Sequence, residues 1–81
     1  MLHPKITSLR AISGYKLHLR FETGEEKVFD VSPYIHGPWF GALRDKEYFK
    51  TVRLLPDGSG IAWADGQDVA PHELYEASAS L

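Results

Sequence analysis

Acidic side chains near the C-terminus come closest to a catalytic or metal-binding pattern in this sequence. They are Asp65, Asp68, Glu73 and Glu76. Neighbouring carboxylates can hold Mg²⁺, or can act as general acid and base when their pKa values differ. However, Asp65 precedes Gly66 in a dipeptide typical of tight turns, and Glu73 follows Pro71 at the start of a predicted helix. We therefore interpret these carboxylates as structural.

No other pattern of side chains indicates catalysis or metal binding. The histidines, at positions 3, 18, 36 and 72, show neither HxxxH nor HxH spacing, and the sequence has no cysteine. The serines lie in no nucleophile elbow, and no helix follows "GSG" at 58–60 as a phosphate cradle requires. We expect no enzymatic activity, no cofactor and no metal.

Tyr34, His36 and Trp39 are the second candidate site, because they form an aromatic group in the segment 32–52, "SPYIHGPWFGALRDKEYFKTV", which contains Pro and Gly. Burial in the core is the simpler interpretation of Trp39. If the aromatic side chains are exposed instead, they favour a protein interface, where such residues contribute most of the binding energy. The candidate interaction residues are Tyr34, His36, Trp39, Asp65, Asp68 and Tyr75.

Two hairpins are predicted to position these residues. "YKLHLRF" (15–21) alternates apolar and polar side chains, and a three-residue loop ending at Gly24 pairs Leu19 with Lys27. The preceding strand, 5–12, is predicted at a sheet edge, with Ile6 and Leu9 on opposite sides. A second hairpin has a four-residue loop at 56–59, which pairs 54 with 61 and places Trp63 in the core.

Short helices are predicted to follow each hairpin. One begins at Pro38 and another is capped by Asp45. The last begins at Pro71, after Ala70, which lacks the oxygen that a cap requires. We expect the carboxylate of Asp68 to accept hydrogen bonds from the first amides of this helix. Residues 77–81 are expected to fray.

These elements predict a single α+β domain over residues 1–76, with a small antiparallel sheet of two hairpins, about four to five strands, and two or three short helices. A chain this short buries only about 60 to 65% of its surface on folding, so a partner or a second copy would add stability. The net charge of -2, without a basic block, argues against nucleic acid. The sequence contains no signal peptide and no long apolar run, so we expect a cytoplasmic protein without a membrane segment.

The order of motifs resembles the bacterial domain of unknown function family numbered 2442 over nearly the whole chain. The residues that carry the resemblance are Gly14, Leu17, Leu19, Phe21, Gly24, Asp30, Leu43, Phe49, Trp63, Gly66, Asp68, Pro71, Leu74 and Tyr75. The sequence departs from the family at Ala70, where a capping Ser or Thr is common.

The resemblance implies a small α+β domain without an established activity. Genes of the family often lie beside a second short family numbered 4160, in an arrangement like that of toxin and antitoxin pairs. Some relatives carry a helix-turn-helix after this module, a part that we do not expect here because the sequence ends at Leu81. We therefore expect an antitoxin-like protein-interaction module whose partner is encoded by a neighbouring gene. Self-association and a small-molecule-binding or regulatory domain are the alternatives.

Overall fold

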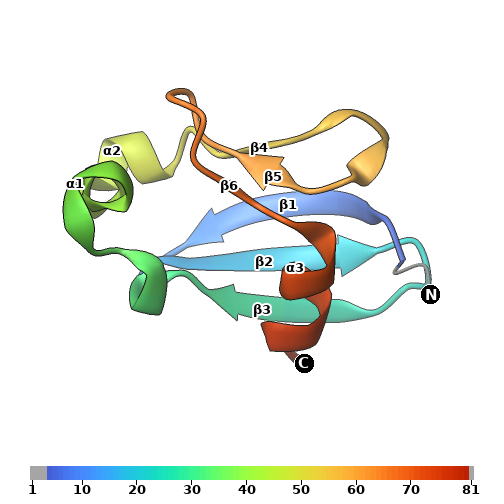
Figure 1. Ribbon diagram of the computed structural model, residues 1–81. Helices are drawn as coiled ribbons and strands as arrows, with labels where there is room; N and C mark the ends of the chain where they lie inside the picture. The colour runs from blue at the N-terminus through green and yellow to red at the C-terminus, as the bar shows by residue number, and fades with distance from the viewer. Residues whose placement is uncertain (1–3, 81) are drawn as a thin grey trace.

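Two antiparallel sheets and several short helices make up the fold in the computed structural model, which describes residues 4–80. The larger sheet has the strand order β1-β2-β3-β7, and the smaller has the order β4-β5-β6. In Figure 1 the smaller sheet lies above the larger, α1 and α2 lie at one end, and α3 crosses the larger sheet. In chain order the elements are β1 (Ile6–Ile12), β2 (Lys16–Phe21), β3 (Glu26–Asp30), the 3-10 turn η1 (Ser32–Tyr34), α1 (Gly37–Phe40), η2 (Gly41–Arg44), α2 (Lys46–Phe49), β4 (Arg53–Leu54), η3 (Pro56–Gly58), β5 (Ile61–Ala62), β6 (Asp68–Val69), α3 (Pro71–Ala77) and β7 (Ala79–Ser80). The predicted α+β class is confirmed, and the two predicted hairpins belong to separate sheets.

The first hairpin has the predicted register. Leu19 pairs with Lys27, and Gly24 has a φ of 90°, which favours glycine in the loop. The amide of Phe21 donates to the carbonyl of Glu25 at 2.9 Å and closes the loop. Loop length and turn chemistry therefore set the register of this hairpin locally.

Strand β1 lies at an edge of the larger sheet, as predicted, but its alternation is broken by a bulge. Ile6 pairs with Phe21, whereas Ser8 already pairs with Arg20, so β1 has an additional residue there. The bulge moves the following residues to the opposite face, and Leu9 joins Ile6 against the core. The prediction that Ile6 and Leu9 lie on opposite sides is therefore wrong.

The second hairpin also has the predicted register and gains a third strand. Leu54 pairs with Ile61, and the amide of Leu55 donates to the carbonyl of Gly60 at 2.9 Å. Strand β6 then pairs with β5. The loop of this hairpin lies against β1, because a Cβ atom added at Gly58 would come within 2.4 Å of a backbone oxygen of Ile6.

The side chain of Trp63 lies at the centre of the core, as predicted. It is fully buried, and its Nε1–H donates to the carbonyl oxygen of Phe49 at 2.9 Å. The ring centroids of Trp63 and Phe49 lie 5.7 Å apart. The other fully buried large apolar side chains are Leu17, Leu19, Phe21, Phe29, Val31, Leu43, Ile61 and Leu74.

The short helices begin where the sequence predicts. Pro38 lies in the first turn of α1, and the carboxylate of Asp45 accepts from the amide of Glu47 at 3.0 Å at the start of α2. Pro71 begins α3. Asp68 does not cap α3: it is held in β6 opposite Ala62, with its side chain exposed. Among the described residues no hydrogen bond joins the Asp68 side chain to an α3 amide, so that prediction is wrong.

The end of the chain is attached to the larger sheet. Ala79 pairs with Val28 and Ser80 pairs with Lys27, which forms β7 within the segment expected to fray. Ser78 donates its hydroxyl to the carbonyl of Leu74. Leu81, the last residue of that segment, lies outside the described residues.

Replacing each tryptophan tests the position of the core. Trp63→Ala should lower the free energy of unfolding by about 3 to 5 kcal/mol because it leaves a cavity at the centre. Trp39→Ala is the matched control, with an expected loss under about 1 kcal/mol because the Trp39 side chain is 52% exposed. Urea denaturation followed by circular dichroism measures both. Equal losses would contradict this description of the core.

Candidate functional site

Trp39 is the exposed large hydrophobic side chain among the described residues, at 52% exposure. The expectation that it packs in the core is therefore wrong. The large apolar side chains that precede and follow it, Ile35 and Leu43, are buried, and Phe40 is half-buried. Helix α1 thus presents its tryptophan to solvent while its neighbours hold the segment to the core.

The chain geometry before and beside Trp39 explains its orientation. His36 is extended, and Gly37 has a φ of 74°, a conformation that turns the chain into α1 at low steric cost. The Trp39 ring lies over Gly66, since a Cβ atom there would be 3.7 Å from Cζ2 of the ring. The predicted tight turn at Asp65-Gly66 is confirmed, with a φ of 105° at Gly66.

A buried polar network holds this part of the molecule together. The side chain of Gln67 is almost fully buried; its Oε1 accepts from the Tyr48 hydroxyl at 2.7 Å, and its Nε2 donates to the Trp39 carbonyl at 2.9 Å. The amide of Asp65 donates to the same Tyr48 hydroxyl at 2.8 Å. Gln67 therefore ties α1, α2 and the β5–β6 loop to one another.

Gln67 and Tyr48 were not singled out by the sequence reasoning. Gln67 stands in a polar stretch between Gly66 and Asp68, and only the alternation with buried Val69 places it on the inner side of the strand. That signal requires β6 to be known as a strand. A two-residue strand gives no periodic pattern to find.

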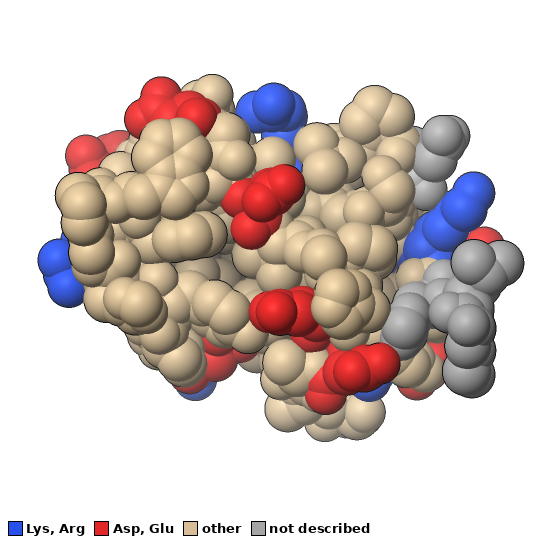
Figure 2. Space-filling view, viewed as in Figure 1, with Lys and Arg blue, Asp and Glu red and all other residues tan. Residues whose placement is uncertain are grey.

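Exposed carboxylates stand before and after Gly66, the residue over which the indole lies. Asp65 and Asp68 are both exposed, and no Lys or Arg follows Arg53 in the sequence. Figure 2 shows acidic side chains over the β5–β6 loop, β6 and α3. We name the exposed residues around the indole the Trp39 surface: His36, Pro38, Trp39, Asp65 and Asp68.

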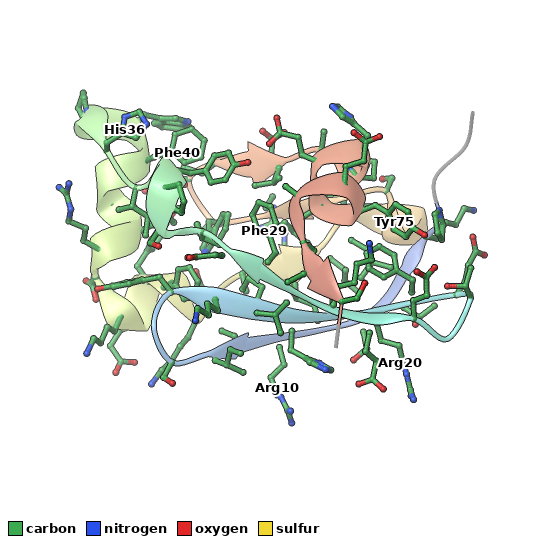
Figure 3. The ribbon with its side chains drawn as sticks, turned by 90° about the horizontal axis from the view of Figure 1, so that it is seen from below. Arg10, Arg20, Phe29, His36, Phe40 and Tyr75 are labelled. Carbon is green, nitrogen blue, oxygen red and sulfur yellow. The ribbon has the colours of Figure 1, made fainter. Side chains whose placement is uncertain are left out.

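Two arginines of the larger sheet lie on another face. Arg10 and Arg20 project from the side of the larger sheet that faces away from α3 (Figure 3). His18 lies between them, with its Nε2 3.0 Å from a carboxylate oxygen of Glu26. Arg10 and Arg20 therefore lie on the side of the sheet opposite the acidic side chains over α3.

Tyr34 has a structural role beside this surface. Its hydroxyl donates to Oε2 of Glu73 at 2.9 Å, and its ring centroid lies 5.5 Å from that of Phe29. The hydrogen bond to the Glu73 carboxylate, followed by burial, raises the pKa of the Tyr34 hydroxyl. The contact joins η1 to α3.

Tyr75 lies at the opposite end of the molecule from His36 (Figure 3) and does not belong to the Trp39 surface. Its hydroxyl donates to the Glu25 carboxylate at 2.9 Å, and the Nζ of Lys27 lies 3.9 Å from the ring centroid. Lys27 also donates to the Tyr75 carbonyl at 2.8 Å. These contacts fasten α3 to the first hairpin.

Among the described side chains, no group of three or more His, Cys, Asp or Glu is placed to hold a metal ion. His3 lies outside the described residues. No helix in the described part of the chain combines the length and the apolar character that crossing a membrane requires.

A family model described as "Protein of unknown function (DUF2442)" matches residues 6–80. The match covers nearly all of the chain, in agreement with the resemblance in its motifs. No curated protein and no solved structure matches the chain.

Removing the Tyr48 hydroxyl tests the network beneath the Trp39 surface. Tyr48→Phe should lower the free energy of unfolding by about 1 to 3 kcal/mol, because the buried Gln67 loses a hydrogen-bond donor. It should also speed hydrogen exchange of the Asp65 amide. Tyr34→Phe is the matched control and should cost less, because water can reach the half-exposed Glu73. Unchanged exchange at Asp65 in Tyr48→Phe would contradict the network.

The hydrogen bond between Tyr75 and Glu25 should make stability depend on pH. The bond lowers the pKa of Glu25 from 4.5 and raises the pKa of Tyr75 from 10.0. The carboxylate contribution is present above about pH 4.5 and is lost as the pH falls through the folded-state pKa. The tyrosine contribution is present below about pH 10 and is lost as the pH rises through the folded-state pKa.

Tyr75→Phe should therefore weaken the pH dependence of the unfolding free energy at both ends, as measured by urea denaturation. Tyr34→Phe is the control for the acid end, because it leaves the bond to Glu25 in place, whereas at the alkaline end it removes a second tyrosine whose pKa is raised. The same acid-side dependence in native protein and Tyr75→Phe would show that other groups cause it.

Proposed function

This chain belongs to the DUF2442 family of proteins of unknown function, and we propose that it is a protein-interaction module that binds its partner through the Trp39 surface. The exposed indole of Trp39 is the observation that carries the proposal. Tryptophan is enriched among the residues that dominate the energy of protein interfaces. Leaving such a side chain in solvent gives up the hydrophobic stabilisation that burial in a complex would restore.

The rigidity around Trp39 supports binding. Gln67 fixes the Trp39 backbone, and Gly66 supports one edge of the ring. A preorganised anchor loses little conformational entropy when it binds, so more of its contact energy appears as affinity.

The charges around Trp39 favour a partner with a basic segment. Asp65 and Asp68 are exposed within two residues of Gly66, over which the indole lies, in a part of the sequence without Lys or Arg. A Lys or Arg of the partner can stack on the indole and be attracted by both carboxylates. Such charges increase the association rate and select the orientation of the partner more than they increase affinity.

We propose as partner the small protein encoded by the neighbouring gene, in an antitoxin-like arrangement in the cytoplasm. The gene arrangement implied by the family resemblance supports this choice. A chain of 81 residues has a small core, so a ligand that binds only the folded state would raise its stability appreciably. A sequence without cysteine is compatible with a reducing compartment.

Coexpression with the product of the neighbouring gene, followed by calorimetric titration, tests the proposal. Trp39→Ala should weaken binding by about 30-fold or more, the effect of a central interface residue. Arg10→Gln is the control, because Arg10 lies on the other side of the sheet (Figure 3), and it should leave affinity unchanged. Loss of binding in Arg10→Gln but not in Trp39→Ala would move the interface to the sheet.

Salt dependence tests the part played by the carboxylates. The double variant Asp65→Asn, Asp68→Asn should slow association and make its rate less sensitive to salt, because it removes exposed charges beside the indole. Stopped-flow mixing measures this rate. Equal salt sensitivity in native and variant protein would contradict a basic partner.

Sedimentation of the protein alone separates the proposed partner from self-association. A native monomer supports a different protein as partner. A native dimer that Trp39→Ala converts to monomer would assign the Trp39 surface to contacts between copies and contradict the neighbouring-gene partner.

A further inference from the structure

A cavity of about 410 Å³ lies between the β1–β2 turn and α2. Its lining shares no residue with the Trp39 surface. The lining residues are Ala11, Ile12, Ser13, Gly14, Tyr15, Lys46, Phe49 and Lys50. Its volume falls within the roughly 300 to 1,000 Å³ typical of small-molecule sites.

Apolar groups form the inner wall of the cavity. Ala11 and Ile12 come from the end of β1, and the rings of Tyr15 and Phe49 meet edge to face with centroids 5.4 Å apart. An apolar ligand group placed there would move from water to an apolar surface, which is favourable. The inner wall therefore suits a hydrocarbon or aromatic group.

Tyr15 is held in place by several contacts, so its wall of the cavity is preformed. It has a φ of 57°, the only positive φ of a residue other than glycine in the part of the chain described. Its hydroxyl donates to the carbonyl of Arg44, and its own carbonyl accepts from the amide of Val31 at 2.9 Å. A bulky residue stays in this backbone conformation only when its surroundings impose it.

Two lysines give the rim of the cavity a positive charge. Lys46 and Lys50 are one helical turn apart at the two ends of α2, and both are exposed. Lys50 has a loose contact with Glu47 at 3.9 Å, whereas Lys46 has no ion pair among the described residues. No carboxylate belongs to the lining. The cavity thus combines an apolar interior with a cationic rim.

We propose that this cavity binds a small amphipathic carboxylate, with its apolar group against Phe49 and Tyr15 and its carboxylate at Lys46 and Lys50. A neutral hydrocarbon would make no use of the lysines. A compact polyanion would leave the apolar wall exposed to water. A carboxylate on an apolar body matches both parts of the site, because each lysine ammonium is a hydrogen-bond donor with a full charge.

Titration with octanoate, followed by amide chemical shifts, tests the site. Saturable shifts are expected at Ala11, Ile12 and Phe49, with a dissociation constant of about 1 mM or tighter. Octylammonium has a body of the same length and the opposite charge, and it should bind at least about fivefold more weakly. Absence of saturable shifts with octanoate would overturn the proposal, as would equal binding of octylammonium.

Variants locate the two halves of the site. The double variant Lys46→Gln, Lys50→Gln should weaken octanoate binding about fivefold, whereas Lys5→Gln, outside the cavity lining, should not. Ala11→Leu should fill part of the cavity and weaken octanoate and 1-octanol alike. The lysines are exposed, so their double variant keeps the test valid if Ala11→Leu fails to fold. Equal weakening by Lys5→Gln would indicate unspecific attraction to cations and overturn the proposal.

Discussion

The buried indole of Trp63 is the contact on which the rest of the structure depends. Its ring packs on Phe49 of α2, and its N–H donates to the carbonyl of that residue. The ring of Phe49 also meets that of Tyr15, edge to face. A three-stranded sheet of two-residue strands has little stability of its own, so this row of aromatic rings joins the smaller sheet to the larger one.

Helix α3 supplies the second connection between distant segments. Glu73 bonds to Tyr34, and Tyr75 bonds to Glu25 at the end of the first hairpin. These contacts lie beyond the two ends of β3, because Glu25 precedes this strand and Tyr34 follows it. Because α3 directly follows β6, fixing the helix also fixes the strand that carries Asp68 and, through Gln67, the position of Trp39.

Local rules predicted much of the fold, and long-range contacts account for the rest. Both hairpin registers follow from loop length, glycine position and alternation, which are properties of neighbouring residues. The separation into two sheets, the bulge in β1 and the short strand β7 depend on pairing between segments far apart in the sequence. No periodic signal within a single segment carries that information.

The candidate interaction residues fall into an exposed group and a structural group, and long-range contacts decide which residue belongs to which. Composition singled out Trp39, Asp65 and Asp68 as candidates, whereas the exposure of the indole depends on Gly66 and Gln67, which lie far from Trp39 in the sequence. Tyr34 and Tyr75 are also aromatic candidates, but their role is structural. The Tyr34 hydroxyl bonds to a carboxylate of α3, and the hydroxyl of Tyr75, in α3, bonds to the carboxylate of Glu25. The consecutive residues Tyr48 and Phe49 extend this division, because Tyr48 supports the Trp39 surface while Phe49 lines the cavity. Both residues are fixed by the same four-residue helix, whose position is set by its cap at Asp45 and by the burial of Phe49, so the packing of α2 shapes both surfaces.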